Sequence, residues 1–101
     1  MTRGDIWLVN LDPTLGSEIR KRRPCVIVSH DHLRTVLVAP MTTASRPAPF
    51  RIGITHGGKK GLILLDQMHA IDKVRLTKKL GAVSAKTLTS TLRTLQEVFA
   101  D

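Results

Sequence analysis

The segment from residue 16 to residue 24 holds the side chains best suited to chemistry. Its sequence, GSEIRKRRP, carries a hydroxyl at Ser17, one carboxylate at Glu18 and four cationic groups at residues 20–23. Arg23 differs from the other cations because Pro24 and the apolar run behind it anchor it. An anchored arginine loses less entropy when it binds a phosphate through two hydrogen bonds. The pattern indicates a phosphate-binding site, the alternative being a flexible basic loop.

Two threonines stand in a similar position further along the chain. Thr42 and Thr43 come shortly after the apolar run of residues 35–39. Polar groups next to the end of a rigid element are often used to build sites. We therefore expect these hydroxyls to belong to the same site as Arg23.

A single-stranded RNA substrate suits this set of groups. The 2′-hydroxyl of RNA can attack the adjacent phosphorus, provided that a proton acceptor, positive charge on the phosphate and a proton donor for the leaving oxygen are present. Arg23 suits the positive charge and can assist the leaving oxygen, but its pKa above about 12 makes it a poor base. Glu18 is a plausible base, and Thr42 can hydrogen-bond the phosphate. This route needs neither a metal nor a cofactor.

The charge distribution agrees with such a substrate. The chain has 101 residues and a net charge of +8. Residues 20–60 contain nine basic residues and one acidic residue, so this part carries the whole net charge. Concentrated positive charge attracts phosphate polymers, although it can also form a solvated face. Only three residues are aromatic, so RNA would be held through phosphates and hydrogen bonds rather than by stacked bases.

Short apolar runs separated by turn residues predict a mainly β protein with one helix. The expected strands are residues 5–11, 25–29, 35–39 (stopped by Pro40), 50–55, 61–65 and, less clearly, 76–83. Residues 12–23 form a loop, and residues 57–61, GGKKG, form a hairpin turn rather than a nucleotide-binding loop. Ser84 is the expected N-cap of a helix of about four turns, whose apolar stripe is Ala85, Leu88, Leu92, Leu95 and Phe99. These short strands separated by turns predict a small barrel or a strongly curved sheet.

Several other kinds of site are disfavoured. Cys25 is the only cysteine, which excludes an internal disulfide, favours a reducing cytoplasmic setting and, in mid-strand, indicates a buried hydrophobe rather than a nucleophile. His30 and His32 lack a nearby third metal ligand. His56 and His69 are isolated, and we expect each to be structural or exposed. No apolar run is long enough for a membrane span, and we expect one domain over residues 1–101.

Four motifs in order give the chain a resemblance to the MazF/PemK family of toxin endoribonucleases. The first two are RGDIW at residues 3–7 and LDPTLGSE at residues 11–18, which lead to Arg23-Pro24 before an apolar strand. The others are VAPMT at residues 38–42 and LLDQ at residues 64–67, followed by Ile71-Asp72. The match covers essentially the whole chain.

This resemblance implies a small SH3-like barrel of the CcdB/Kid/MazF type, with five to seven short strands and a C-terminal helix. It also implies a homodimer, a MazE-like antitoxin, and metal-independent cleavage of single-stranded RNA to 2′,3′-cyclic phosphate and 5′-hydroxyl ends. The family's catalytic arginine falls on Arg23 and its threonine on Thr42. Its acidic residue falls on Glu18 in some members and on Asp66 in others. Residues expected to contact RNA are Gly16, Ser17, Arg20, Lys21, Arg22, Thr43, Arg46, Arg51, Lys59, Lys60 and Gln67.

Two departures from the family pattern affect which residue can act as the general base in RNA cleavage. Some members carry a histidine where this chain has Ser17, and some carry an arginine where it has Leu64. Glu18 or Asp66 would then have to supply the base, although Asp66 can equally be a structural cap at a strand end. Two rival functions stay open: a non-catalytic RNA-binding module, and a toxin of the same fold that poisons a protein such as DNA gyrase.

Overall fold

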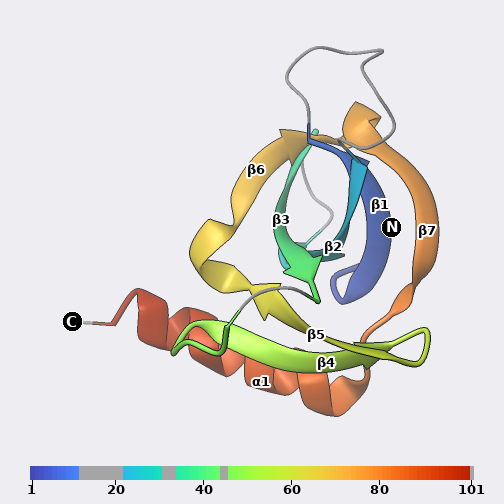
Figure 1. Ribbon diagram of the computed structural model, residues 1–101. Coiled ribbons are helices and arrows are strands. Elements are labelled where there is room, and N and C mark those ends of the chain that lie inside the picture. Colours follow the sequence, from blue (N-terminus) through green and yellow to red (C-terminus); the bar gives the residue numbers. More distant parts are fainter. Residues whose placement is uncertain (12–21, 31–33, 44–45, 101) are drawn as a thin grey trace.

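The short apolar runs pair into one strongly bent antiparallel sheet, with a helix at the C-terminus (Figure 1). The computed structural model describes residues 1–11, 22–30, 34–43 and 46–100. Within them the sheet has seven strands: β1 (Asp5–Asn10), β2 (Arg22–Ile27), β3 (Thr35–Thr42), β4 (Arg51–His56), β5 (Lys59–Leu64), β6 (His69–Asp72) and β7 (Leu76–Ala82). The helix is α1 (Ala85–Val98), and two short 3₁₀ turns are η2 (Leu65–Gln67) and η3 (Lys73–Arg75).

Strand β3 organises the sheet because it changes neighbour along its length. The strand order is β4-β5-β3-β2-β1-β7, and β6 pairs with residues 35–38 of β3. Beyond this, Met41 and Thr42 pair with β5. Pro40 lies between the two ladders, where neither β5 nor β6 pairs with it. The expectation that Pro40 stops the strand is therefore wrong, because a residue without an N–H is tolerated where a ladder is interrupted.

Strand β2 begins earlier than expected. Arg22 and Arg23 pair with Asn10 and Val9 of β1, whereas the ladder between β2 and β3 covers only residues 25–27 of β2. The first half of β2 thus has one neighbour, and Pro24 is tolerated there. Arg23 is consequently a strand residue, not the last residue of a loop.

The hairpin between β4 and β5 is confirmed, with a shorter turn. Gly57 and Gly58 have φ angles of +59° and +76°, as the two central residues of a type I′ turn require. His56 and Lys59 are paired directly before and after them. Lys59 and Lys60 belong to β5 rather than to the turn. Strand β6 was not expected, since its four residues include one buried apolar side chain, Ile71, and only pairing with β3 identifies it.

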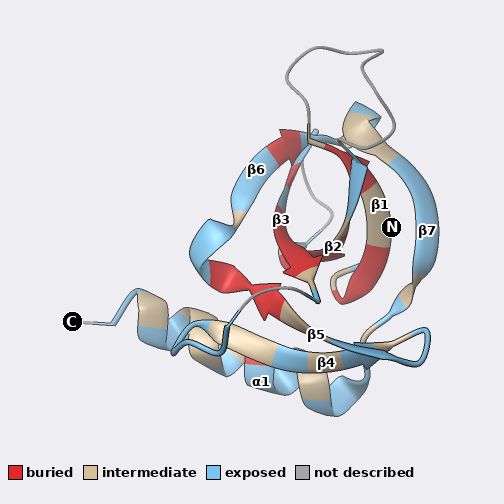
Figure 2. Ribbon diagram, viewed as in Figure 1, coloured by how far each residue is buried: buried red, intermediate tan, exposed pale blue. Residues whose placement is uncertain are grey.

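Both faces of the central strands are buried (Figure 2). Val26 and Val28 belong to one apolar cluster, while Cys25 and Ile27 belong to a second cluster on the other face of β2. The first cluster is completed by Ile6, Ala39, Met41, Ile63 and Leu65, and the second by Val9, Val36, Val38 and Ile71. This double burial explains why residues 25–28 are all apolar rather than alternating with polar residues.

The C-terminal helix is confirmed, and its cap is the expected one. The Oγ of Ser84 accepts a hydrogen bond of 3.1 Å from the backbone N–H of Thr87. Leu95 packs against the first cluster. Phe99 was expected on the packed stripe, but it lies beyond the helix and is 73% exposed, because that end of α1 projects past the sheet (Figure 1). Among the described residues, no helix has the length and apolar character needed to cross a membrane.

Candidate active site

A pocket of about 350 Å³ opens where the ends of four strands meet. Its lining residues come from β2, β3, β4 and β5 and from the residue after β3: Arg23, Pro24, Met41, Thr42, Thr43, Ile54, His56, Lys59 and Gly61. Four of these, Arg23, Thr42, Thr43 and Lys59, are residues that the sequence analysis assigned to the site. A pocket of this size can hold part of a nucleotide chain.

The register of the sheet brings Arg23 and Thr42 to the same end of their strands. Cys25 and Pro40 form the last pair of the ladder between β2 and β3. Arg23 lies two residues before Cys25, and Thr42 lies two residues after Pro40. Because the strands are antiparallel, both residues stand just beyond this last pair, and both line the pocket.

A close approach of two backbones sets the position of Thr42. Thr42 pairs with Leu62 of β5, and the neighbouring Gly61 lies directly against it. A Cβ atom at position 61 would be only 2.8 Å from the Thr42 carbonyl oxygen. The two strands can therefore approach this closely only because residue 61 is a glycine.

The thiol of Cys25 lies behind Arg23 and takes no part in the pocket's surface. Its side chain is fully buried, and Sγ donates a 3.6 Å hydrogen bond to the Arg23 carbonyl oxygen. Burial raises the pKa of the Cys25 thiol to about 12. Such a thiol is not a nucleophile near neutral pH, which agrees with its expected role as a buried hydrophobe.

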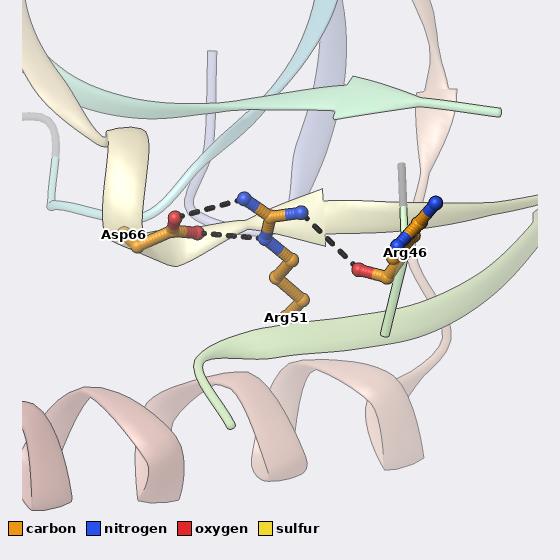
Figure 3. A network of polar contacts seen from close by, with 3 residues as sticks. All are labelled: Arg46, Arg51 and Asp66. Carbon is orange, nitrogen blue, oxygen red and sulfur yellow. Dashed lines mark hydrogen bonds and ion pairs between the residues drawn. The ribbon is translucent and has the colours of Figure 1, made fainter. Parts of the chain in front are cut away.

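Asp66 lies outside the residues that line the pocket, in an ion pair with Arg51 (Figure 3). Arg51 donates from Nε to Oδ1 at 3.3 Å and from Nη2 to Oδ2 at 3.1 Å, and its Nη1 donates to the Arg46 carbonyl oxygen at 3.1 Å. The side-chain hydrogen bond from Arg51 lowers the pKa of Asp66. The lowered pKa makes the Asp66 carboxylate a weaker base. The ion pair connects η2 to β4.

Comparison with known proteins identifies the family. Residues 2–99 match the family model described as a PemK-like, MazF-like toxin of type II toxin-antitoxin systems. The chain belongs to this family. It is 38% identical to Endoribonuclease MazF of Staphylococcus saprophyticus over 85% of this chain and 80% of that protein. It is 34% identical to Endoribonuclease PemK of Escherichia coli over 97% and 81% of the two chains.

The fold agrees with solved structures of MazF proteins. A chain in the MazE-MazF crystal structure from Deinococcus radiodurans superposes with a TM-score of 0.80, at 20% identity, over 99% of this chain and 95% of that chain. At this identity the likeness concerns the fold. The expected fold class, a small barrel-like sheet with a C-terminal helix, is confirmed.

The remaining residues assigned to the site of this PemK/MazF-family chain are more scattered. Arg22, Arg46 and Gln67 are exposed and do not line the pocket. Lys60 lines a second hollow, of about 640 Å³, between the β4–β5 hairpin and the N-terminal end of α1. Five assigned residues lie outside the described residues: Gly16, Ser17, Glu18, Arg20 and Lys21.

His56 is the ionisable pocket residue that the sequence analysis did not assign to the site. It was treated as isolated, yet it lies beside Ile54 in the pocket wall. Ile52 and Ile54 pack against the first cluster, and side chains two residues apart share one face of a strand. Extending this alternation by two residues would have placed His56 on the same inward face.

The described residues give no support to a metal-binding site. Arg3 Nη1 donates to His30 Nε2 at 3.0 Å, and His32 lies outside the described residues. Within the described ranges, no three His, Cys, Asp or Glu side chains are grouped so that they could hold a metal ion.

Proposed function

We propose that this PemK/MazF-family protein is the toxin of a toxin-antitoxin pair and a sequence-specific endoribonuclease acting on single-stranded RNA. The observation that carries the proposal is the shared pocket of Arg23, Thr42 and Lys59, at the end of β2 and β3. The relatives named above bear the name endoribonuclease, and the chain's net charge of +8 suits a polyanionic substrate.

The proposed reaction uses the substrate's own nucleophile. The 2′-oxygen forms a bond to the adjacent phosphorus, and the bond from phosphorus to the 5′-oxygen breaks. The products are a 2′,3′-cyclic phosphate and a 5′-hydroxyl. The Arg23 guanidinium binds the non-bridging oxygens and stabilises the charge that develops on them, and the Thr42 hydroxyl hydrogen-bonds the phosphate. This route requires no metal.

Lys59 extends the positive surface from Arg23 toward the β4–β5 turn. Both residues line the pocket, so a phosphate backbone that crosses it meets a cation from β2 and another from β5. Arg51 differs from these two cations, because its guanidinium already donates hydrogen bonds to the Asp66 carboxylate and to the Arg46 carbonyl oxygen. Cleavage of RNA by this protein would inhibit translation and growth.

The partners follow from the same proposal. An acidic MazE-like antitoxin would compete with RNA for the basic pocket through electrostatic complementarity. Self-association as a homodimer is supported by large apolar side chains at the surface, of which Val74 and Phe99 are 68% and 73% exposed. We place the protein in the cytoplasm, where its RNA substrates are made and its single thiol stays reduced.

The decisive experiment compares the wild-type protein, Arg23→Ala and Arg93→Ala on a long single-stranded RNA in EDTA at low salt. Arg93 is a matched control because it is an exposed arginine on α1, away from the pocket. We expect wild type and Arg93→Ala to make discrete cuts ending in 2′,3′-cyclic phosphate, and Arg23→Ala to make none while retaining its thermal stability.

Other results would favour the rival functions. Salt-sensitive binding without cleavage by the wild-type protein would indicate an RNA-binding module. Growth inhibition by a protein that neither binds nor cuts RNA would indicate a protein target. Cleavage by Arg23→Ala at the wild-type rate would refute the role given to Arg23.

A further inference from the structure

We infer that His56 is a catalytic residue of this protein, the general base that takes the proton from the attacking 2′-hydroxyl. This inference rests on the proposed ribonuclease function. It starts from the described lining of the pocket, where Arg23, Thr42 and Lys59 come together with His56 and no carboxylate. Of the two bases expected from the sequence, Glu18 lies outside the described residues and Asp66 lies outside the pocket lining.

The side chains that line the pocket differ in their ability to accept a proton. Arg23 and Lys59 are the other ionisable side chains there, and both are cations without a free lone pair near neutral pH. The threonine hydroxyls accept hydrogen bonds but do not hold an added proton. An imidazole in its neutral form has one nitrogen that accepts a proton. Among the described lining residues, His56 is therefore the group able to act as a base.

The His56 ring is held in place by packing. His56 ends β4 on the face that Ile52 and Ile54 turn toward the core. On its other side the ring lies against β7, where a Cβ at Gly81 would be 3.0 Å from His56 Cε1. β4 and β7 are the two ends of the strand path, so this contact bridges the edges of the curved sheet. A ring fixed between two strands suits a group that must meet a substrate atom accurately.

The His56 nitrogens are available to a substrate. Within the part of the chain that the structure describes, no hydrogen bond or ion pair engages this imidazole. His30 and His69 are different, because His30 Nε2 accepts from Arg3 and His69 Nδ1 lies 2.9 Å from the Gln67 carbonyl oxygen. Of these three histidines, the one in the pocket is thus the one whose ring is left for RNA.

Asp66 suits the role of base less well. Its carboxylate is held by two hydrogen bonds from Arg51 and lies outside the pocket lining. To act as a base it would have to leave this ion pair, and the hydrogen bond that lowers its pKa also weakens it as a base. His56 needs no such rearrangement.

Neutral His56 takes the 2′-proton as the 2′-oxygen bonds to phosphorus, and the bond to the 5′-oxygen breaks. The 5′-oxygen takes a proton from solvent water, and the imidazolium returns its proton to the solvent. Arg23 and Lys59 stabilise the phosphate's negative charge throughout.

The test compares His56→Gln, His56→Ala and the control His69→Gln with the wild-type protein. Gln keeps hydrogen-bonding capacity but cannot take up a proton. We expect the single-turnover cleavage rate of both His56 variants to fall by about 10²–10⁴-fold, the usual contribution of a general base, with RNA affinity and thermal stability retained. His69→Gln should cleave as wild type does.

Two further measurements separate a base from other roles. Added imidazole should restore part of the His56→Ala activity, whereas pyrazole, which has the same size but is a far weaker base, should not. A substrate with sulfur in place of the 5′-oxygen has a leaving group that needs no proton. The defect of His56→Gln should persist with it, and its disappearance would make His56 the acid and overturn the inference.

The inference and the proposed function fail in different ways. If wild type cleaves RNA and the His56 variants cleave equally well, the inference is wrong and the ribonuclease function stands. If the variants lose RNA affinity in proportion to activity, His56 binds rather than acts as a base. If wild type does not cleave RNA, the proposed function itself is wrong.

Discussion

Substituting Gly61 by alanine tests whether the close contact of β5 and β3 positions the site. The added Cβ would lie 2.8 Å from the Thr42 carbonyl oxygen, and ordinary contact begins at 3.4 Å. The obstacle is backbone, so the two strands must separate by several tenths of an ångström. Overpacking of this kind costs about 1–3 kcal/mol, and each kcal/mol lowers Tm by about 4–8 °C in a domain of this size.

The same displacement moves Thr42 in the pocket. Because a misplacement of about 1 Å can cost about 10²-fold in rate, we expect Gly61→Ala to lower RNA cleavage by about tenfold or more. Gly53→Ala is the matched control, because it lies in the same hairpin and its Cβ would meet no atom within 4 Å. The assay is cleavage of a fluorogenic RNA alongside thermal unfolding. Equal rates and equal Tm for the two variants would refute the reasoning.

The other predictions concern Asp66 and Cys25, whose pKa values are shifted in the part of the chain that the structure describes. Because the pKa of Asp66 is lowered in the folded protein, its ion pair with Arg51 should stabilise the fold above the ordinary aspartate pKa of about 3.9 and lose this effect as pH falls through the lower folded-state pKa. A double-mutant cycle with Arg51→Ala and Asp66→Ala should give a coupling of about 0.5–1 kcal/mol at pH 7, since both side chains are partly exposed. The coupling should shrink as the carboxylate becomes protonated in acid, and a pH-independent coupling would contradict the assignment. Cys25, whose pKa burial raises to about 12, should react with a thiol reagent at neutral pH only as fast as the protein opens, so destabilising the fold with urea should speed the reaction, and rapid labelling of the native protein would contradict its burial.

Many elements could be predicted from the sequence because their signals are local. The apolar run at residues 25–28, the turn glycines Gly57 and Gly58, and the cap Ser84 each act through near neighbours in the chain. The structure has a strand, a hairpin turn and a helix start at these places. The ends of elements were less predictable. At Pro40 the chain continues as a strand, because a proline is tolerated where the ladder beside it is interrupted.

The residues of the candidate site also differ in how far they could be predicted from the sequence. Arg23 and Thr42 could be named from residue type and from the motifs around them, and both line the pocket. The ion pair of Asp66 with Arg51 could not be named, because it joins residues 15 positions apart on different elements. Local alternation could have placed His56 on the inward face of its strand, but its sharing of the pocket with Arg23 and its packing against Gly81 involve residues distant in the chain.

By itself the sequence determined the class of the protein: a basic, mainly β chain with a C-terminal helix. It also supplied the hypothesis that an arginine next to an apolar strand binds phosphate. These properties follow from composition, periodicity and motif order, which are read along the chain. Only the tertiary structure decided which groups share the pocket, because strand pairing brings the ends of β2, β3, β4 and β5 together across dozens of residues. It left Asp66 outside the pocket and placed the His56 imidazole in the same pocket lining as Arg23, and the proposal of His56 as the base depends on these long-range placements.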